Sequence, residues 1–241
     1  MAAEKLASVA AIICAAGNSS RMGGIKKEYQ KLKGGATVLG SAVSAFTSVS
    51  SIGVIVIAIP KDTEDSARSA LPTQLLITQT PKILFAAGGD TRQTSVFNAL
   101  CVLAEYNPQY VLIHDGARPW ITSFLIESVI KETKKHSAVI PLLPLTDTPK
   151  ECNVPLHEFI QEPFKESIFI KNHLKRAFTG VAQTPQGFKY SEILNAHKKA
   201  ALKREEFTDD AEIWGRFCGP VAVIPGDPEN RKITFPEDFY Q

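Results

Sequence analysis

Short, continuous apolar runs recur along the chain and constrain its fold more than any other feature. They occupy residues 9–14, 54–59, 83–87, 111–114, 138–143 and 221–224. Because their apolar residues are consecutive rather than alternating, the runs are typical of strands that are covered on both faces. Stretches with the apolar spacing of helices lie between them, at 38–46, 96–103, 124–134 and 190–203. This alternation predicts an α/β protein with a buried, mostly parallel sheet whose strands end along one edge.

The segment 144–183 interrupts this alternation. It mixes short β-branched and aromatic pieces with charged residues, and it contains Pro144, Pro149, Pro155 and Pro163. A structureless loop of this length is improbable in a compact domain. We therefore expect a hairpin-like arm, inserted into a single domain over 1–241, that packs on something else such as another subunit.

Composition and charge exclude several classes of protein. The 44% apolar content is ample for a packed core, and 27 Lys and Arg against 25 Asp and Glu give a net charge of +2. This balance gives no basis for a nucleic-acid or membrane partner. The four cysteines lie far apart, without the spacing of a zinc site. The first apolar run is too short for a membrane span, and no arginine-rich transit pattern accompanies it, so we expect a cytoplasmic protein with reduced thiols.

The first apolar run leads into the stretch CAAGNSSRMGGIKKEY at residues 14–29. Its AAG portion has almost no side-chain bulk, so ligand atoms can approach the backbone, and the N–H groups of such a turn can point at phosphate oxygens. Arg21, Lys26 and Lys27 then add positive charge, which suits phosphate. The pattern matches neither a Walker loop nor the dinucleotide fingerprint. It predicts a polyphosphate site, although a small-residue turn before a solvated basic segment also explains it.

Two further clusters follow strands at the same predicted edge. AGGDTRQTS at 87–95 contains Asp90, Thr91 and Ser95, which can cap the following helix or bond to a base or sugar. HDGARP at 114–119 ends the next strand. A carboxylate such as Asp115 at the end of a buried strand needs a donor, which a ribose hydroxyl, a metal-bound nucleotide or Arg118 could supply.

Four later pieces complete an ordered set: DTPK at 147–150, QTPQ at 183–186, FTDDAE at 207–212 and NRKIT at 230–234. Each has a structural explanation by itself; FTDDAE, for instance, suits the start of a helix. Together with AAGNSSRM, KKEY, GGDTRQTS, HDGARP and Arg176, they make the chain resemble the 2-C-methyl-D-erythritol 4-phosphate cytidylyltransferase family of the non-mevalonate isoprenoid pathway. The resemblance covers nearly the whole chain, in family order.

This resemblance implies a Rossmann-like nucleotidyltransferase fold, in which the segment 144–183 is a β-arm that joins two subunits into a homodimer. It implies the reaction of CTP with 2-C-methyl-D-erythritol 4-phosphate, which yields 4-diphosphocytidyl-2-C-methyl-D-erythritol and pyrophosphate. Mg²⁺ in this family is held chiefly by the triphosphate oxygens. The resemblance therefore names no protein ligand for the metal, and Asp115 is a candidate for an outer-shell contact.

The resemblance also assigns roles to individual residues. Arg21 and Lys27 are expected to stabilise the transition state, and Lys27 is chosen over Lys26 because it directly precedes the Glu28-Tyr29 pair. The residues implied to bind the nucleotide are Ala15, Ala16, Gly17, Gly89, Asp90, Ser95, Asp115 and Gly116. Those implied to bind the methylerythritol phosphate or to lie near it are Thr148, Arg176, Thr184, Thr208, Asp209 and Lys232.

The chain departs from the family pattern in its first loop. Asn18-Ser19-Ser20 stands where relatives commonly carry a second glycine, and Ile25-Lys26 stands where proline is common. The loop is therefore expected to close differently over the triphosphate.

Two alternative functions remain open at this point. A ribitol 5-phosphate cytidylyltransferase would share the fold and the nucleotide, but the AAG and DTPK elements favour methylerythritol phosphate as the acceptor. A nucleotide-binding module without catalysis would tolerate loss of the cations and of the arm residues. The sequence favours an enzyme because it retains all of these residues, namely Arg21, Lys27, Arg176 and Lys232.

Overall fold

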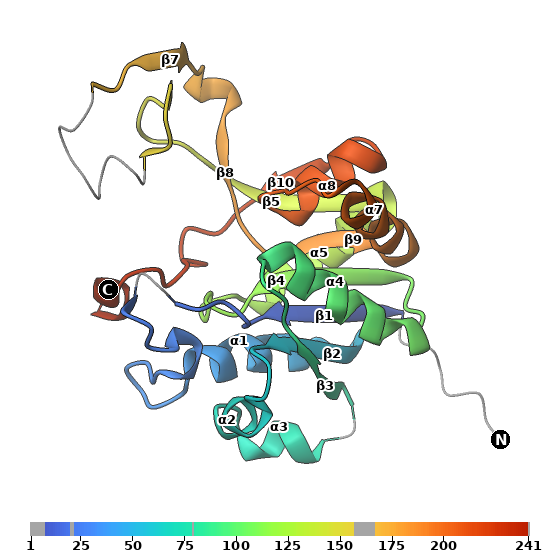
Figure 1. Ribbon diagram of the computed structural model, residues 1–241. Coiled ribbons are helices and arrows are strands. Elements are labelled where there is room, and N and C mark those ends of the chain that lie inside the picture. The colour runs from blue at the N-terminus through green and yellow to red at the C-terminus, as the bar shows by residue number, and fades with distance from the viewer. Residues whose placement is uncertain (1–7, 20–21, 79, 157–166, 241) are drawn as a thin grey trace.

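The computed structural model in Figure 1 describes residues 8–19, 22–78, 80–156 and 167–240. Its centre is a sheet with the strand order β10-β5-β9-β4-β1-β2-β3, and β8 pairs with β5 beside this path. The strands are β1 (Val9–Cys14), β2 (Ile52–Ile59), β3 (Lys82–Ala87), β4 (Tyr110–Asp115), β5 (Ala138–Pro144), β8 (Gly180–Ala182), β9 (Gln186–Lys189) and β10 (Ala222–Pro225). The pairs β1–β2, β2–β3, β1–β4 and β5–β10 run parallel, which confirms the mostly parallel sheet.

The sequence does not predict β9, which lies between β4 and β5 and runs antiparallel to both. The strand is short and contains Gly187, which weakens its apolar signal. A Cβ atom at this glycine would collide with the side chain of Thr133. The glycine therefore lets helix α5 (Ser123–His136) pack closely on the sheet.

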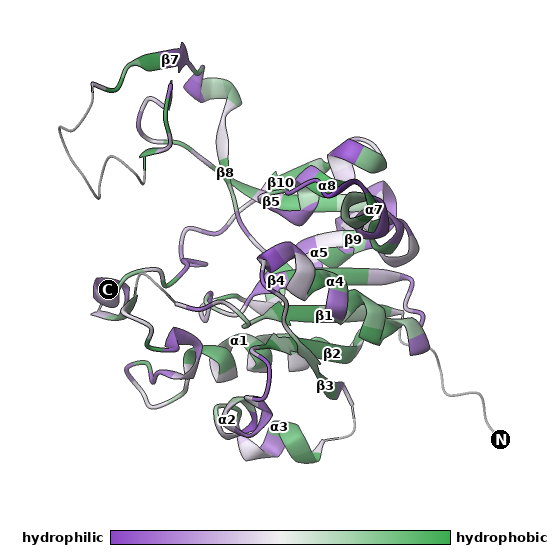
Figure 2. Cartoon of the chain, in the orientation of Figure 1, coloured by the Kyte–Doolittle hydropathy of each residue, from purple (hydrophilic) through white to green (hydrophobic). Residues whose placement is uncertain are grey.

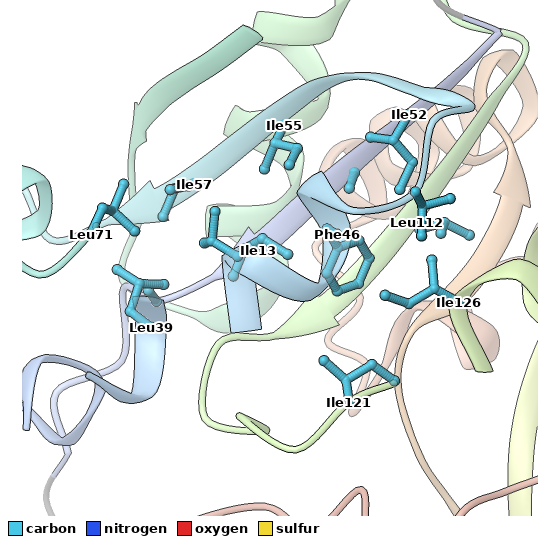
Figure 3. Packing of buried hydrophobic residues seen from close by; sticks show 14 of the residues in the cluster. Ile13, Leu39, Phe46, Ile52, Ile55, Ile57, Leu71, Leu112, Ile121 and Ile126 are labelled. Atoms are coloured by element: carbon cyan, nitrogen blue, oxygen red, sulfur yellow. The ribbon is translucent and has the colours of Figure 1, made fainter. Parts of the chain in front are cut away.

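Helices cover both faces of the sheet (Figure 1). The first face carries α1 (Val38–Thr47), α2 (Glu64–Ser69) and α5; the second carries α4 (Arg92–Val102), α7 (Tyr190–Lys203) and α8 (Asp210–Phe217). In β1, Val9, Ala11 and Ile13 pack into the first core, whereas Ala10 and Ile12 pack into the second. This double burial explains why the apolar runs are continuous. Figure 3 shows the first core, where Phe46 of α1 lies among residues of the strands and of α5, and Figure 2 shows the hydrophobic strands.

Side-chain caps determine where several helices begin. Thr37 caps α1, Thr91 caps α4, Thr122 caps α5 and Asp209 caps α8, and each side chain accepts a hydrogen bond from a backbone N–H three residues later. Two of these caps lie in the motifs GGDTRQTS and FTDDAE. The shorter helical elements are α3 (Thr73–Ile77) and the 3₁₀ turns η2 (Lys27–Tyr29), η3 (Leu103–Glu105), η4 (Arg176–Phe178) and η5 (Pro236–Tyr240). In the ranges that the structure describes, no helix is both long and apolar enough to cross a bilayer.

The arm projects from the sheet after β5 (Figure 1). Its strands β6 (Lys150–Cys152) and β7 (Ile170–His173) pair antiparallel in a small sheet of their own. The expected hairpin-like segment is therefore present, although the chain rejoins the central sheet at β8, before residue 183, because β8 pairs with β5. Pro163 lies outside the described residues.

Candidate active site

The loops after β1, β3 and β4 surround a cavity of about 320 Å³ at the carboxyl edge of the sheet. β1 has β2 on one side and β4 on the other, and such a change in the direction of strand order is where open α/β sheets bind ligands. The lining residues are Cys14, Ala16, Gly17, Asn18, Ser19, Lys27, Glu28, Gly89, Asp90, Thr91, Arg92, Ser95, Asp115, Ala117, Lys232 and Thr234. The structure thus gathers most of the predicted nucleotide contacts, together with Lys27 and Lys232, around one space.

The first two loops approach each other closely because both carry small residues. A Cβ atom on Gly88 would collide with the Cβ of Ala16 and lie 3.1 Å from the carbonyl oxygen of Ile59. Gly17, by contrast, has nothing within 4 Å of the position that a Cβ would occupy. The backbone at Gly17 is therefore open to a ligand, whereas the lack of a side chain at Gly88 lets the two loops pack together.

Ser95 shapes the second loop from the first turn of α4. Its Oγ accepts a hydrogen bond from the Gly89 N–H at 3.0 Å and donates to the carbonyl oxygen of Thr91 at 2.9 Å. Asp90, in the same loop, is exposed and lines the cavity. The hydroxyl of Ser95 thus holds the backbone that presents Gly89 and Asp90.

Asp115, the last residue of β4, is the centre of the charges in the site. Lys232 Nζ lies 2.8 Å from its Oδ2, and Arg92 Nε lies 3.5 Å from its Oδ1. Arg118 Nε is more distant, at 3.7 Å from Oδ2. Burial opposes ionisation of the carboxyl, but these three cations outweigh it and hold the pKa of Asp115 well below its ordinary range. The donors that this buried carboxylate requires are therefore side chains of the protein.

Arg92 connects this cluster to α7 and α8. Its Nη1 donates to Asp210 Oδ2 at 2.8 Å, and His197 Nε2 lies 3.1 Å from the other oxygen of Asp210. Burial opposes ionisation of Asp210, while Arg92 and then His197 lower its pKa. None of Arg92, His197 and Asp210 is among the site residues predicted from the sequence. Arg92 carries a signal, as the cation within GGDTRQTS, whereas nothing local marks His197.

Thr184 lies behind Asp115 rather than on the cavity wall. Its Oγ1 accepts a hydrogen bond from the Asp115 backbone N–H at 3.0 Å and lies 3.0 Å from Nδ1 of His114. The other ring nitrogen of His114 lies 3.2 Å from the carbonyl oxygen of Arg118. A neutral imidazole protonated on Nε2 satisfies both contacts, and burial lowers the pKa of His114 to about 4. The direct role of Thr184 toward substrate stays a prediction.

Several other predicted residues support the site without lining it. Ala15 is buried and donates from its N–H to the carbonyl oxygen of Ala58 at 2.8 Å. Gly116 packs where a Cβ would lie 3.0 Å from the carbonyl oxygen of Cys14. Asp209 caps α8 through Oδ1 and accepts from Gln186 Nε2 at 2.8 Å, and Thr208 donates to Glu212. These contacts agree with the structural explanation of FTDDAE as the start of a helix.

Thr148 and Arg176 belong to the arm and do not line the cavity. Arg176 is exposed, and its Nη1 donates to the carbonyl oxygen of Thr146 at 2.6 Å. Arg21 lies outside the described residues, so the structure places only Lys27 of the two predicted catalytic cations. Within the described ranges, no group of three or more His, Cys, Asp and Glu side chains could hold a metal ion.

The sheet order, the cavity at its carboxyl edge and the cations around that cavity place the chain in the class of α/β nucleotidyltransferases. The sequence model of the family described as IspD, 2-C-methyl-D-erythritol 4-phosphate cytidylyltransferase, matches residues 9–241, and the chain belongs to this family. The resemblance drawn from the motifs is thereby confirmed.

Curated relatives and solved structures agree with this family membership. The bifunctional enzyme IspD/IspF of Bartonella tribocorum is 38% identical over 237 residues, which cover 96% of this chain and 54% of that protein. The same-named enzyme of a Bradyrhizobium species is 40% identical over 234 residues, with 95% and 54% covered. The chain thus spans about half the length of the curated relatives that it matches.

Two solved structures are similar over almost their whole length. The 4-diphosphocytidyl-2C-methyl-D-erythritol synthase of Anaerococcus prevotii has a TM-score of 0.77 at 27% identity, with 96% of this chain and 94% of that chain covered. The 2-C-methyl-D-erythritol 4-phosphate cytidylyltransferase of Thermus thermophilus has a TM-score of 0.71 at 29% identity, with 96% and 95% covered. These similarities confirm the predicted nucleotidyltransferase fold.

Proposed function

We propose that the chain transfers CMP from CTP to 2-C-methyl-D-erythritol 4-phosphate, giving 4-diphosphocytidyl-2-C-methyl-D-erythritol and pyrophosphate. Family membership and the names of its relatives support this reaction. The observation that carries it is the cavity at the carboxyl edge, where the open backbone of Gly17 and the side chains of Lys27 and Lys232 line one space.

The reaction needs positioning and charge more than covalent help. A phosphate oxygen of the acceptor attacks the α-phosphorus of CTP, and the bond from that phosphorus to the bridging oxygen breaks as pyrophosphate leaves. Two anions must approach each other, and the developing charge at phosphorus must be stabilised. Lys27 and Lys232 supply positive charge at the cavity wall, and Arg21 keeps the role that the resemblance assigns to it.

The base and ribose are proposed to bind beside the second loop. Gly89 and Asp90 line this part of the cavity, and Ser95 holds their backbone. The exposed carboxylate of Asp90 can accept hydrogen bonds from the cytosine amino group or a ribose hydroxyl. The triphosphate would then extend toward the open backbone of Gly17 and toward Lys27.

We propose that Mg²⁺ accompanies CTP, and when bound it would neutralise part of the negative charge of the phosphates. The residues present fit a metal held mainly by the nucleotide, because Lys232, Arg92 and Arg118 already surround the carboxylate of Asp115. Asp90 is the carboxylate that lines the cavity without an ion-pair partner among the described residues.

The arm is proposed to join two copies of the chain into a homodimer. It presents large apolar side chains to solvent, namely Leu156, Phe169, Ile170, Leu174 and Phe178. Apolar side chains that gather on a projecting element are typical of an interface. A partner's arm would bring Thr148 and Arg176 toward the cavity, as the resemblance implies. The cytoplasmic location also stays a proposal.

Pyrophosphate release tests the reaction directly. Purified protein with CTP and Mg²⁺ is assayed with 2-C-methyl-D-erythritol 4-phosphate, with ribitol 5-phosphate and without an acceptor. We expect release with methylerythritol phosphate alone. Release with ribitol phosphate alone would assign another acceptor, and CTP binding without release would indicate a module that does not catalyse.

Lys27→Ala tests the catalytic assignment. We expect kcat to fall by about 100-fold or more while the Kd for CTP changes by a few-fold at most, because preorganised charge acts mainly on the transition state. Single-turnover kinetics and calorimetric CTP binding measure the two quantities. Lys33→Ala is the matched control, since Lys33 is exposed and does not line the cavity. Near-normal kcat in Lys27→Ala would contradict the role.

A further inference from the structure

Lys26 does not line the cavity, yet it joins two segments that do. Its Nζ donates to the carbonyl oxygen of Gly17 at 2.6 Å and lies 3.4 Å from Oε2 of Glu28. Gly17 and Glu28 both belong to the cavity wall. The side chain of Lys26 thus bridges the loop after β1 and the 3₁₀ turn η2 that carries Lys27.

Ser19 adds weaker bonds between the same two segments. Its Oγ lies 3.5 Å from Glu28 Oε2 and accepts from the Lys27 backbone N–H at 3.4 Å. The backbone of Ser19 is in the left-handed region, with φ of 49°, and its carbonyl oxygen accepts from the Met22 N–H at 2.8 Å. We refer to Gly17, Ser19, Lys26 and Glu28 as the loop clamp.

The negative charge of Glu28 explains why the clamp needs a cation at position 26. Glu28 is only 4% exposed and lies on the wall of a cavity proposed to receive a triphosphate. An unpaired carboxylate there would be costly to bury and would repel phosphate. Lys26 neutralises this carboxylate and also supplies a donor to the Gly17 carbonyl oxygen.

The backbone conformation of Lys26 does not explain why a lysine stands at this position. Its φ is −66°, the angle that proline imposes, so the local conformation does not require lysine. The reason for a lysine here must therefore lie in the contacts of its side chain with Gly17 and Glu28. The burial of that side chain, which lowers the pKa of Lys26 although Glu28 opposes the change, agrees with a structural bridge.

We propose that Lys26 is a positioning residue that acts through the loop clamp. It holds the Gly17 loop against η2 and neutralises Glu28, so that the open backbone of Gly17 can bind the triphosphate. The proposal rests on the proposed function and deepens it, since it assigns to Lys26 a role in nucleotide binding that differs from the catalytic role of Lys27.

Two variants and their combination test the clamp. Lys26→Pro removes the bridge while keeping the backbone φ angle, and it removes the ion pair between Lys26 and Glu28. We expect the Kd for CTP, measured by calorimetry, and the KM for CTP to rise roughly tenfold, which is the size of effect expected when residues in direct contact are uncoupled. The KM for the acceptor should stay within about twofold of the parent value. Adding Glu28→Gln removes the negative charge that Lys26 no longer neutralises and is expected to restore most of the lost affinity.

Lys33→Met is the matched control, because Lys33 is an exposed lysine that does not line the cavity. Lys26→Met, with its similar length, repeats the test where proline prevents folding. CTP affinity within twofold of the parent in Lys26→Met would overturn the proposal. So would a double variant no better than Lys26→Pro alone, since that would indicate direct contact between Lys26 and phosphate.

Calorimetry separates this proposal from the proposed reaction. A parent protein that binds CTP but releases no pyrophosphate would reject the reaction and still report on the clamp through the affinities of the variants. A parent protein that binds no CTP would overturn both.

Discussion

Asp115 shows at the scale of a single residue how a buried carboxylate serves a site for anions. Two of the cations that surround it, Lys232 and Arg92, also line the cavity. The carboxylate therefore holds positive charge in place where a phosphate is proposed to bind. Arg92 in turn pairs with Asp210, so the local charge is set by a connected group of side chains rather than by one lysine.

His114 supplies a prediction at the same scale. Its folded pKa is about 4, below the value of about 6.5 expected for an unfolded chain. As the pH falls from about 6.5 to 4, the unfolded state therefore binds a proton that the folded state does not, and the free energy of unfolding decreases by up to about 3 kcal/mol. Asp115 and Arg118 are the charged groups beside the ring.

Urea denaturation of the parent and of His114→Gln between pH 7 and 4.5 measures this effect. We expect the variant to lose less stability over that interval, whatever its stability at pH 7. His136→Gln, which removes an exposed histidine, is the matched control. A parallel decrease in all three proteins would show that His114 is not the cause.

At the scale of elements, the site depends on how closely the loops after β1 and β3 pack. Gly88 follows β3 and contacts Ala16, which follows β1. Parallel pairing of both strands with β2 sets the spacing of these loops. Only small side chains fit that spacing, so the AAG and GGD motifs have a packing reason in addition to their role near a ligand.

Gly88→Ala is expected to lower the free energy of unfolding by about 1–3 kcal/mol, because the added methyl group overpacks the contact with Ala16 and Ile59. The affinity for CTP should also fall, because the added methyl group forces the loops after β1 and β3 apart. Chemical denaturation and calorimetry measure the two effects. Gly215→Ala, in α8 with nothing within 4 Å of the added atom, should instead raise stability by up to about 1 kcal/mol. Equal stability of Gly88→Ala and the parent would contradict this packing argument.

At the scale of the whole molecule, the arm is the element that the central sheet does not bury (Figure 1). Phe178 of the arm is 87% exposed and belongs to the same 3₁₀ turn, η4, as Arg176. Burying such a side chain between two copies would stabilise a dimer by about 1.5–3 kcal/mol per copy. The proposed contribution of Arg176 to a partner's cavity would then depend on the same contact.

Phe178→Asp is expected to shift the mass measured by light scattering from about twice 26.3 kDa toward 26.3 kDa. Pyrophosphate release should fall in parallel, because the arm residues would no longer reach a second cavity. Leu202→Asp is the matched control, as Leu202 is 85% exposed on α7 and far along the chain from the arm. A monomeric parent, or a variant that remains dimeric, would reject the proposed interface.

The sequence by itself determined the parallel strands, the loops that follow them and the departure of the arm. These features depend on local patterns: continuous apolar runs mark strands buried on both faces, and small residues after them mark turns. The residues around Gly17, Asp90 and Asp115 could be predicted as neighbours because parallel strands end at one edge. The motif order then identified the family.

Only the tertiary structure decided which partners the charged and polar side chains take. It paired Asp115 with Lys232, linked Arg92 to Asp210, and turned Thr184 inward toward His114. It also inserted β9 antiparallel between β4 and β5. These partners are distant in sequence, and no local periodicity encodes them, because they arise when separate elements pack and buried charges must be satisfied.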